Sequence, residues 1–167
     1  AKVAARGIAR TFQNIRLFRS MTVEQNVMVA GFRIHKAGLL SAVLRNQRYM
    51  DDEREFRRRA AELLDIFNLA DLAGEPADSL PYGSQRRLEI ARALMLSPKL
   101  LLLDEPAAGM NSQEAAELEK QIRFLRDELG LTVVLVEHNM SVVMAVCETI
   151  HVVDHGETIA EGPPSHI

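Results

Sequence analysis

The sequence has one cysteine, no long apolar run and no strong excess of either charge, and each shortage excludes a class of protein. Because Cys147 stands alone, an internal disulfide framework is excluded, and a reducing cytosol suits the chain. The apolar stretches KLLLL and LTVVLV are much too short to span a bilayer. The opening residues, AKVAARGIAR, lack the apolar core of a signal peptide. The formal net charge of -3 gives no reason to expect nucleic acid or an anionic membrane as the main partner.

The residues that are present suffice for one ordinary domain. The chain has 167 residues, of which 47% are hydrophobic and 26% charged, a globular rather than a disordered profile. Cys147 lies within SVVMAVC, so we expect a buried, inert thiol. Because the first residue is not methionine and EGPPSHI stops without a closing element, we expect both ends to be cut.

Residues 21 to about 75 are expected to be helical. Thr22 and Gln25 form a capping-box pattern at the start of MTVEQNVMVAG, which ends at Gly31. Further on, one helical face carries Phe56, Ala60, Leu63, Leu64 and Phe67. Four arginines of this segment (Arg54, Arg57, Arg58 and Arg59) lie among Asp51, Asp52, Glu53 and Glu55, which favours a solvated mixed-charge face over nucleic-acid binding. LAGEPADSLP then breaks the pattern.

From residue 84 onward the pattern alternates between helix and strand. SQRRLEIARALML predicts a helix with its leucines inside and its arginines outside. KLLLLDE and LTVVLV are continuous apolar runs, typical of strands buried on both faces. The segment between them predicts a helix that starts at Asn111 and Glu114 and ends at Gly130. Its apolar stripe is Ala115, Leu118, Ile122, Leu125 and Leu129.

A strand, a helix and a second strand in this order predict a parallel sheet. NMSVVMAVCE then predicts a helix, and TIHVVDHGETIAEG predicts two strands around an Asp-His-Gly turn. The expected fold class is therefore α/β, with a helical insertion in the core.

Polar pairs follow both apolar strands. Asp104 and Glu105 end the first, and Glu137 and His138 end the second. Because ligands bind beyond the carboxyl ends of parallel strands, both pairs are expected at one edge of the sheet. A carboxylate there can hold Mg²⁺ through water, a second can deprotonate a water, and a histidine can contact a transferred phosphoryl group. Either pair alone is equally well explained as ordinary surface residues, but the two together favour a site.

The third candidate element is LPYGSQRRLEIARAL. Gly83 before a helix predicts a tight turn whose free backbone N–H groups suit a phosphate, although a lone glycine is a weak signal. Ser84 is a candidate helix cap. Arg86, Arg87 and Arg92 are expected on a solvated helix face rather than as phosphate ligands.

Together these motifs resemble the ATP-binding cassette (ABC) ATPases. KLLLLDEP is similar to their Walker B strand, LPYGSQRRLEIARAL to their signature loop and helix, ARTFQN to the glutamine loop, AGMN to the D-loop and LVEH to the switch-histidine loop. Order and spacing agree from residue 1 to 167. GIARTFQNIRLFRSMTV, YGSQRRLEIARAL and DEPAAGMN resemble most the ATP-binding subunits of branched-chain amino-acid importers.

The resemblance implies a partial P-loop NTPase core with a parallel sheet and an inserted helical subdomain. Residues 1–20 would be the glutamine-loop segment of the core, 21–80 the helical subdomain, and 81–167 the signature helix and the C-terminal part of the core. The implied cofactors are ATP and Mg²⁺. Gln13 would touch the metal and the attacking water, Asp104 would bind Mg²⁺ through water, Glu105 would be the general base, and His138 would contact the γ-phosphate.

The implied partners are a second ATPase subunit, in a homo- or heterodimer, and transmembrane permease subunits, with a substrate-binding protein acting indirectly. The signature residues Tyr82, Gly83, Ser84 and Gln85, with Asn111 of the D-loop, would close over ATP held by the second subunit. NIRLF and the helices after Met21 would dock against the permease. The protein would be cytoplasmic and peripheral on the inner face of the cell membrane.

The sequence departs from the family at four points. Pro81 stands where serine is common, Ser84 where glutamine is usual, and Asn111 where aspartate is usual, so a hydroxyl and a charge are lost from the contact between subunits. No G-x-x-x-x-G-K-[ST] loop occurs, so the phosphate cradle is missing. We therefore expect an N-terminal third to be absent, and the chain alone to bind ATP weakly and to be inactive.

Two other functions remain open. One is a soluble ABC ATPase of DNA repair or translation, which usually carries a coiled coil or a second cassette. The other is a non-catalytic docking module, which the changes at Pro81 and Ser84 would fit but the intact Asp104, Glu105 and His138 would not.

Overall fold

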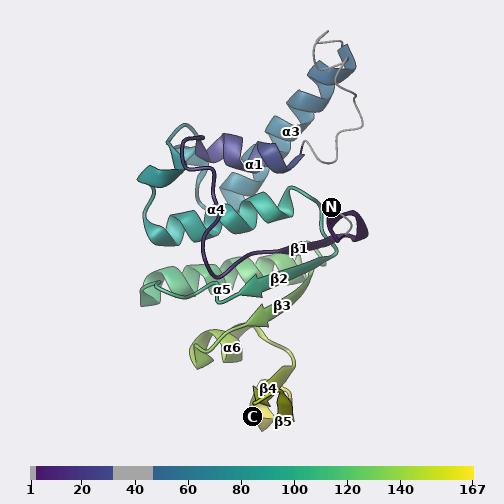
Figure 1. The fold of residues 1–167 in the computed structure, drawn as a ribbon, viewed down its shortest axis with the longest axis vertical. Helices are drawn as coiled ribbons and strands as arrows, with labels where there is room; N and C mark the ends of the chain where they lie inside the picture. The colour runs from purple at the N-terminus through teal and green to yellow at the C-terminus, as the bar shows by residue number, and fades with distance from the viewer. Residues whose placement is uncertain (1–2, 32–46) are drawn as a thin grey trace.

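The computed structural model describes residues 3–31 and 47–167. Part of the segment expected to be helical, residues 32–46, lies outside the described residues. The elements, shown in Figure 1, are η1 (Ala4–Arg6), β1 (Ile8–Arg10), α1 (Val23–Gly31), α3 (Gln47–Ile66), η2 (Ala70–Leu72), η3 (Ala77–Ser79), α4 (Tyr82–Leu94), β2 (Leu100–Asp104), α5 (Ser112–Asp127), β3 (Thr132–Val136), α6 (Met140–Val146), β4 (Ile150–Asp154), β5 (Glu157–Gly162) and η4 (Pro164–His166).

A parallel sheet in the order β1-β2-β3 forms the centre of the molecule. Ile8 pairs with Leu100 in β2, and Leu100 in turn pairs with Thr132 of β3. β2 and β3 are joined through α5, which confirms the predicted strand–helix–strand unit. All three carboxyl ends therefore lie at one edge of the sheet.

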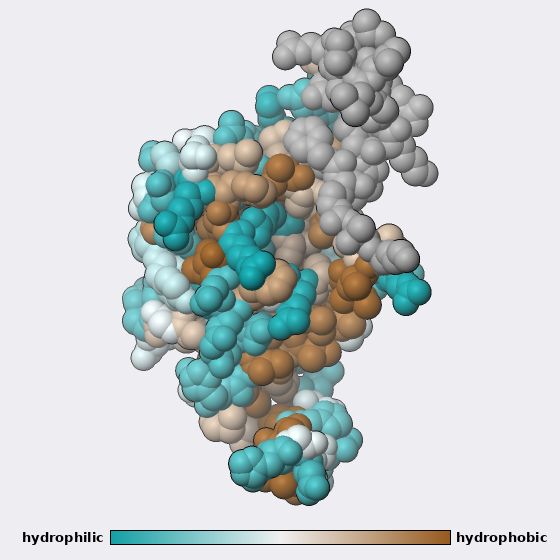
Figure 2. All heavy atoms as spheres, viewed as in Figure 1, coloured by the Kyte–Doolittle hydropathy of each residue, from teal (hydrophilic) through white to brown (hydrophobic). Residues whose placement is uncertain are grey.

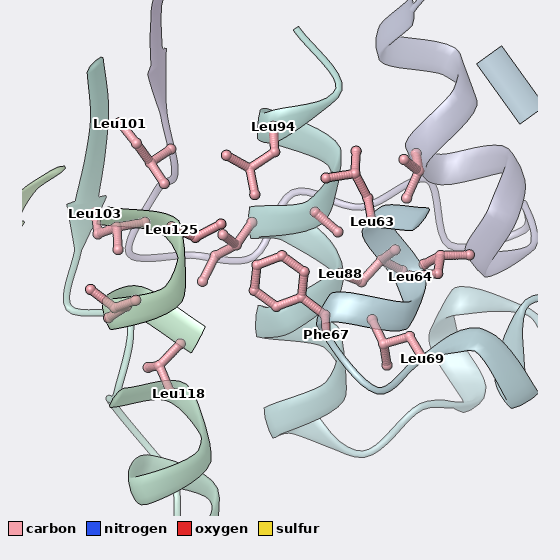
Figure 3. Close-up of a cluster of buried hydrophobic side chains, with 14 of the residues drawn as sticks. Leu63, Leu64, Phe67, Leu69, Leu88, Leu94, Leu101, Leu103, Leu118 and Leu125 are labelled. Carbon is pink, nitrogen blue, oxygen red and sulfur yellow. The ribbon is translucent and has the colours of Figure 1, made fainter. Parts of the chain in front are cut away.

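One face of the sheet carries the core. Leu101 and Leu103 of β2 point toward Leu118 and Leu125 of α5, and the cluster continues through α4 to Phe67 beyond α3 (Figure 3). Full burial of each such side chain contributes roughly 1.5–3 kcal/mol to stability. This face follows from the alternation of side chains along each strand.

The prediction that both strands are buried on both faces is wrong. β2 alternates between buried and half-buried residues, and in β3 Val134 is 46% and Val136 59% exposed. Figure 2 shows hydrophobic side chains gathered over this part of the surface. An apolar run indicates that both faces of a strand are suited to burial, but burial requires neighbouring elements that cover each face. The helices of the described residues cover only one face of this sheet.

The helical part confirms its local signals. Thr22 and Gln25 exchange the two hydrogen bonds of a capping box, at 3.0 and 3.2 Å. Of the apolar face predicted for this segment, Ala60, Leu63 and Leu64 of α3 and Phe67 just beyond it are buried, and Phe56 packs against them. On its opposite face Arg58 pairs with Glu55 and Glu62, as expected for a solvated mixed-charge surface.

The C-terminal elements follow the predicted order, with one error. α5 is capped by Asn111 and Glu114 as expected, but Leu129 is 52% exposed because the helix ends at Asp127. β4 and β5 form the predicted antiparallel hairpin, and His155 and Gly156 make its turn with φ of 47° and 86°. Within the described ranges, no helix is both long and apolar enough to cross a membrane.

Candidate functional site

Glu105 is the centre of the candidate site. It follows the last residue of β2 with a φ of 46°, a left-handed conformation that turns the chain out of the strand. Its backbone N–H donates to the carbonyl of Val136 in β3, at 2.8 Å, which holds the turn against the neighbouring strand. The Glu105 side chain is 27% exposed, so solvent and ligand can reach it.

Residues that follow the other two strands converge on this carboxylate. Gln13, beyond β1, donates from Nε2 to Oε2 of Glu105 at 3.0 Å. His138, beyond β3, places Nδ1 at 3.6 Å from Oε1, an ion-pair distance when the imidazole is protonated. The structure thus brings together Gln13, Glu105 and His138, which are far apart in the sequence.

Asp104 lies beside this group, but its carboxylate forms an ion pair with an arginine. Arg10 Nη2 lies 2.9 Å from Asp104 Oδ2, across the strand pair β1 and β2. Mg²⁺ usually keeps several waters and takes one or two protein carboxylates together with substrate phosphates. The Asp104 carboxylate fits this donor set. Among the described residues, no group of three or more His, Cys, Asp or Glu lies close enough together to enclose a metal ion.

Glu137 has a different role from its neighbour His138. Its carboxylate accepts from the backbone N–H groups of Ala107 (2.8 Å), His138 (3.0 Å) and Asn139 (3.2 Å). Glu137 therefore joins the loops after β2 and β3 and positions His138.

The start of α4 departs from two predictions. The helix begins at Tyr82 with Pro81 as its N-cap, so Gly83 lies inside the first turn rather than in a loop before it. Ser84 does not cap the helix, because its hydroxyl accepts from Arg87 at 3.0 Å instead. A Cβ on Gly83 would lie 2.5 Å from Oε1 of Glu114, so the missing side chain lets the starts of α4 and α5 approach closely.

The burial of Arg86 differs most from what the sequence predicts. Arg86 was expected on a solvated face, but it is 2% exposed. Its guanidinium donates to the carbonyls of Phe12, at 2.6 Å, and Gln13, and to the hydroxyl of Tyr82 at 3.0 Å. Arg87 and Arg92 are half-buried, and burial lowers the pKa of the Arg92 guanidinium.

The remaining predicted residues lie near the same edge. Asn111 accepts from the N–H groups of Gln113 and Glu114 and caps α5. Gln85 donates to the carbonyl of Leu80 at 2.8 Å. A pocket of about 480 Å³ lies between residues 13–19 and the side chains of Tyr82 and Gln85.

Comparison with known proteins decides the family. The family model described as ABC transporter matches residues 1–108. The chain belongs to the ABC transporter family. The predicted resemblance is confirmed, as is the α/β fold of an ABC ATPase.

The ABC relatives include one transport protein and two solved cassettes. Over 166 residues the chain is 43% identical to the high-affinity branched-chain amino acid transport ATP-binding protein BraF of Pseudomonas aeruginosa, covering 99% of this chain and 65% of that protein. It matches cbiO1 of Clostridium perfringens, part of the ABC transporter complex cbiONQ, with a TM-score of 0.81 and 27% identity, over 97% of this chain and 59% of that one. It also matches a dimeric ATP-binding cassette bound to ADP and Pi, with a TM-score of 0.76 and 27% identity, over 94% and 62% of the two chains. The chain spans less than two thirds of the length of the curated relatives it matches.

Three contacts at the candidate site of this ABC chain were not predicted from the sequence. Arg86 carries no sign of burial in the sequence, because it stands beside Arg87 in a pattern that equally fits an exposed face. Arg10 could be paired with Asp104 only once β1 was known to neighbour β2. Glu137 was placed at the correct edge, but its backbone partners depend on the approach of two loops.

Proposed function

We propose that this protein is the ATP-binding and ATP-hydrolysing subunit of an ABC importer for branched-chain amino acids, coupling hydrolysis to transport. The convergence of Gln13 and His138 on Glu105 carries the proposal, because it gathers a base, a water-orienting amide and an imidazole at one edge. The 43% identity to BraF over nearly the whole chain supports the substrate class.

Each residue of this edge has a proposed role. Glu105 acts as general base toward the attacking water, and Gln13, 3.0 Å away, orients that water. His138 contacts the γ-phosphate, and Glu137 holds His138 in place by accepting a hydrogen bond from its backbone N–H. Asp104 would hold Mg²⁺ through water in place of its ion pair with Arg10, and Gln13 would also touch the metal. Bound Mg²⁺ would neutralise charge on the phosphates of ATP.

The signature residues are proposed to serve a second ATPase subunit. Tyr82, Gly83, Ser84 and Gln85, with Asn111, would contact ATP held by that subunit, whether it is a second copy or a different chain. The close approach of α4 and α5 at Gly83 supports this, since it presents both helix starts together. Pro81 supplies no hydroxyl and no N–H there, so the contact relies on the neighbouring residues.

The other partners and the location follow from the same proposal. Transmembrane permease subunits would dock at the pocket beside residues 13–19, and a substrate-binding protein would act through the permease. The subunit would be cytoplasmic and peripheral on the inner face of the membrane. Residues 1–20 would form the glutamine-loop segment, 21–80 the helical subdomain, and 81–167 the signature helix and C-terminal core.

Glu105→Gln tests the proposal in the full-length protein assembled with its permease. We expect ATP turnover to fall by roughly 10²-fold or more while ATP is still bound, because the amide cannot accept the proton of the attacking water. Phosphate release and ATP binding are measured on the same preparation. Glu157→Gln, on the exposed β5 strand, is the matched control and should retain full turnover. Equal turnover in Glu105→Gln and the parent protein would contradict the proposed role.

A further inference from the structure

A buried guanidinium joins α4 to the loop that carries Gln13. Arg86 Nη1 donates to the carbonyl of Phe12 at 2.6 Å, and Nη2 donates to the carbonyl of Gln13. The carbonyls of two consecutive peptide units are therefore held by a single planar group. This fork matches two neighbouring acceptors in a way that an ammonium group does not.

Glu89, one turn further along α4, completes the clamp. Its Oε2 lies 3.4 Å from Arg86 Nη1, and its Oε1 accepts from the backbone N–H of Arg16 at 3.4 Å. Glu89 is 2% exposed, so the pair is removed from water on both sides. Residues 12–16 are thus held at both ends by charged groups of one helix.

The same guanidinium reaches the signature segment. Arg86 Nη2 donates to the hydroxyl of Tyr82 at 3.0 Å, and Gln13 donates in turn to Glu105 at 3.0 Å. Direct contacts therefore run from Tyr82 through Arg86 and Gln13 to Glu105. The Tyr82 side chain is 45% exposed, so a ligand can reach its end of this path.

Stability alone gives a poor account of this arrangement. A buried ion pair stabilises little relative to apolar side chains of similar size. Arg86 Nε is also buried and has no hydrogen-bond partner among the described residues. The two terminal nitrogens of the guanidinium donate to the carbonyls of residues 12 and 13 and to Tyr82, while Nε is left without an acceptor.

We infer that Arg86 is a positioning residue that couples the two nucleotide sites of the dimer. The inference rests on the proposed function. The signature of one chain serves the site of its partner, whereas Glu105 and Gln13 serve the chain's own site. Engagement of Tyr82 by nucleotide on the partner would therefore act, through Arg86, on the placement of Gln13 against Glu105 of the same chain.

The test uses a dimer in which a single site can turn over. The partner subunit carries Gln in place of its catalytic base (Glu105→Gln where the partner is a second copy), so all hydrolysis depends on Glu105 of the other chain. Tyr82→Phe is then introduced into that other chain, whose own signature faces the inactive site. We expect kcat to fall about fivefold with KM little changed, because one hydrogen bond of the path is lost while the ring remains.

The outcomes separate this inference from the proposed function. Unchanged kcat in Tyr82→Phe overturns the inference, because a tyrosine that merely contacted ATP would affect only the inactive site. If the parent dimer shows no turnover that depends on Glu105, both the inference and the proposed function fail.

Hydrogen exchange of the nucleotide-free protein gives a readout independent of hydrolysis. Arg86→Lys keeps the charge but loses the fork, so exchange within residues 12–16 is expected to accelerate roughly tenfold. Arg58→Met is the matched control, since it removes an exposed arginine paired with Glu55 and Glu62 and should leave this segment unchanged. Equal exchange in Arg86→Lys and the parent protein would show that no clamp exists.

Discussion

Backbone strain marks Glu105 among the residues of the sheet edge. Its φ of 46° is left-handed, a conformation that costs an L-residue on the order of 1–2 kcal/mol. Asn68, Ser97 and His155 also have a positive φ and, like Glu105, lie just beyond the end of a helix or strand. At Glu105 the turn is held by the N–H bond to Val136 and places the carboxylate between Gln13 and His138. The strain therefore accompanies an arrangement suited to chemistry.

Glu137→Ala is expected to destabilise the site and the fold together. Its carboxylate accepts from three backbone N–H groups, and removing it leaves those donors unpaired, which costs about 2–3 kcal/mol of unfolding free energy. Urea denaturation measures this loss. Glu157→Ala, on an exposed strand, should change the same quantity by less than about 0.5 kcal/mol. A Glu137→Ala protein as stable as its parent would show that these bonds contribute nothing.

Glu89 is expected to make the unfolding free energy depend on pH. Burial raises the pKa of its carboxyl, while the N–H of Arg16 and the charge of Arg86 act in the opposite direction. Because the folded state holds this proton more tightly than the unfolded state, the stabilisation is complete below about pH 4.3, the ordinary Glu value, and is lost as the pH rises through the raised pKa.

Glu89→Gln should therefore flatten the pH dependence of the unfolding free energy over that interval. Urea denaturation at a series of pH values measures the slope. The exposed Glu157→Gln is expected to keep the slope of the parent protein. The same slope in Glu89→Gln and the parent would rule out Glu89 as the titrating group.

At the scale of elements, α5 depends on its N-terminal cap, which lies in the segment that resembles a D-loop. Asn111 accepts from the N–H groups of Gln113 and Glu114, and Glu114 accepts from the N–H of Asn111 at 3.0 Å. Asn111→Ala is expected to lower the unfolding free energy by about 1 kcal/mol, because the side-chain acceptor is lost. Asn111→Asp should retain the parent stability, since aspartate caps equally well and its charge suits the helix dipole. Thermal or urea unfolding of the three proteins checks the order, and an Ala variant as stable as the Asp variant would contradict it.

At the scale of the whole molecule, one strand of the sheet is largely exposed and the sequence contains no phosphate-binding loop. Val134 and Val136 of β3 are largely exposed, and residues 1–167 contain no G-x-x-x-x-G-K-[ST] loop. We expect the isolated 167-residue chain neither to bind ATP tightly nor to hydrolyse it, because no described helix start combines a glycine-rich loop with a lysine. Calorimetric titration with ATP and an assay of phosphate release measure both. Turnover by this chain that disappears in Glu105→Gln would contradict the expectation.

Most signals carried by neighbouring residues predicted their elements correctly, although Ser84 does not cap α4. The capping boxes at Thr22 and Asn111, the turn at Gly156 and the stripe of α3 depend on spacing within one or two turns of chain. The prediction that the ends of β2 and β3 share an edge also follows from the sequence alone, since consecutive strands joined by a helix are parallel.

The sequence by itself determined the family, the α/β class and the order of the elements, and it predicted Gln13, Glu105 and His138 as site residues, which the structure brings together. Tertiary structure alone decided that Arg86 is buried, that β3 is covered on one face, and that Asp104 pairs with Arg10. Local patterns are set by bonds and contacts between near neighbours, so they can be read along the chain. The burial of an arginine and the covering of a strand depend on which distant elements pack against them, and the periodicity of one segment carries no information on that.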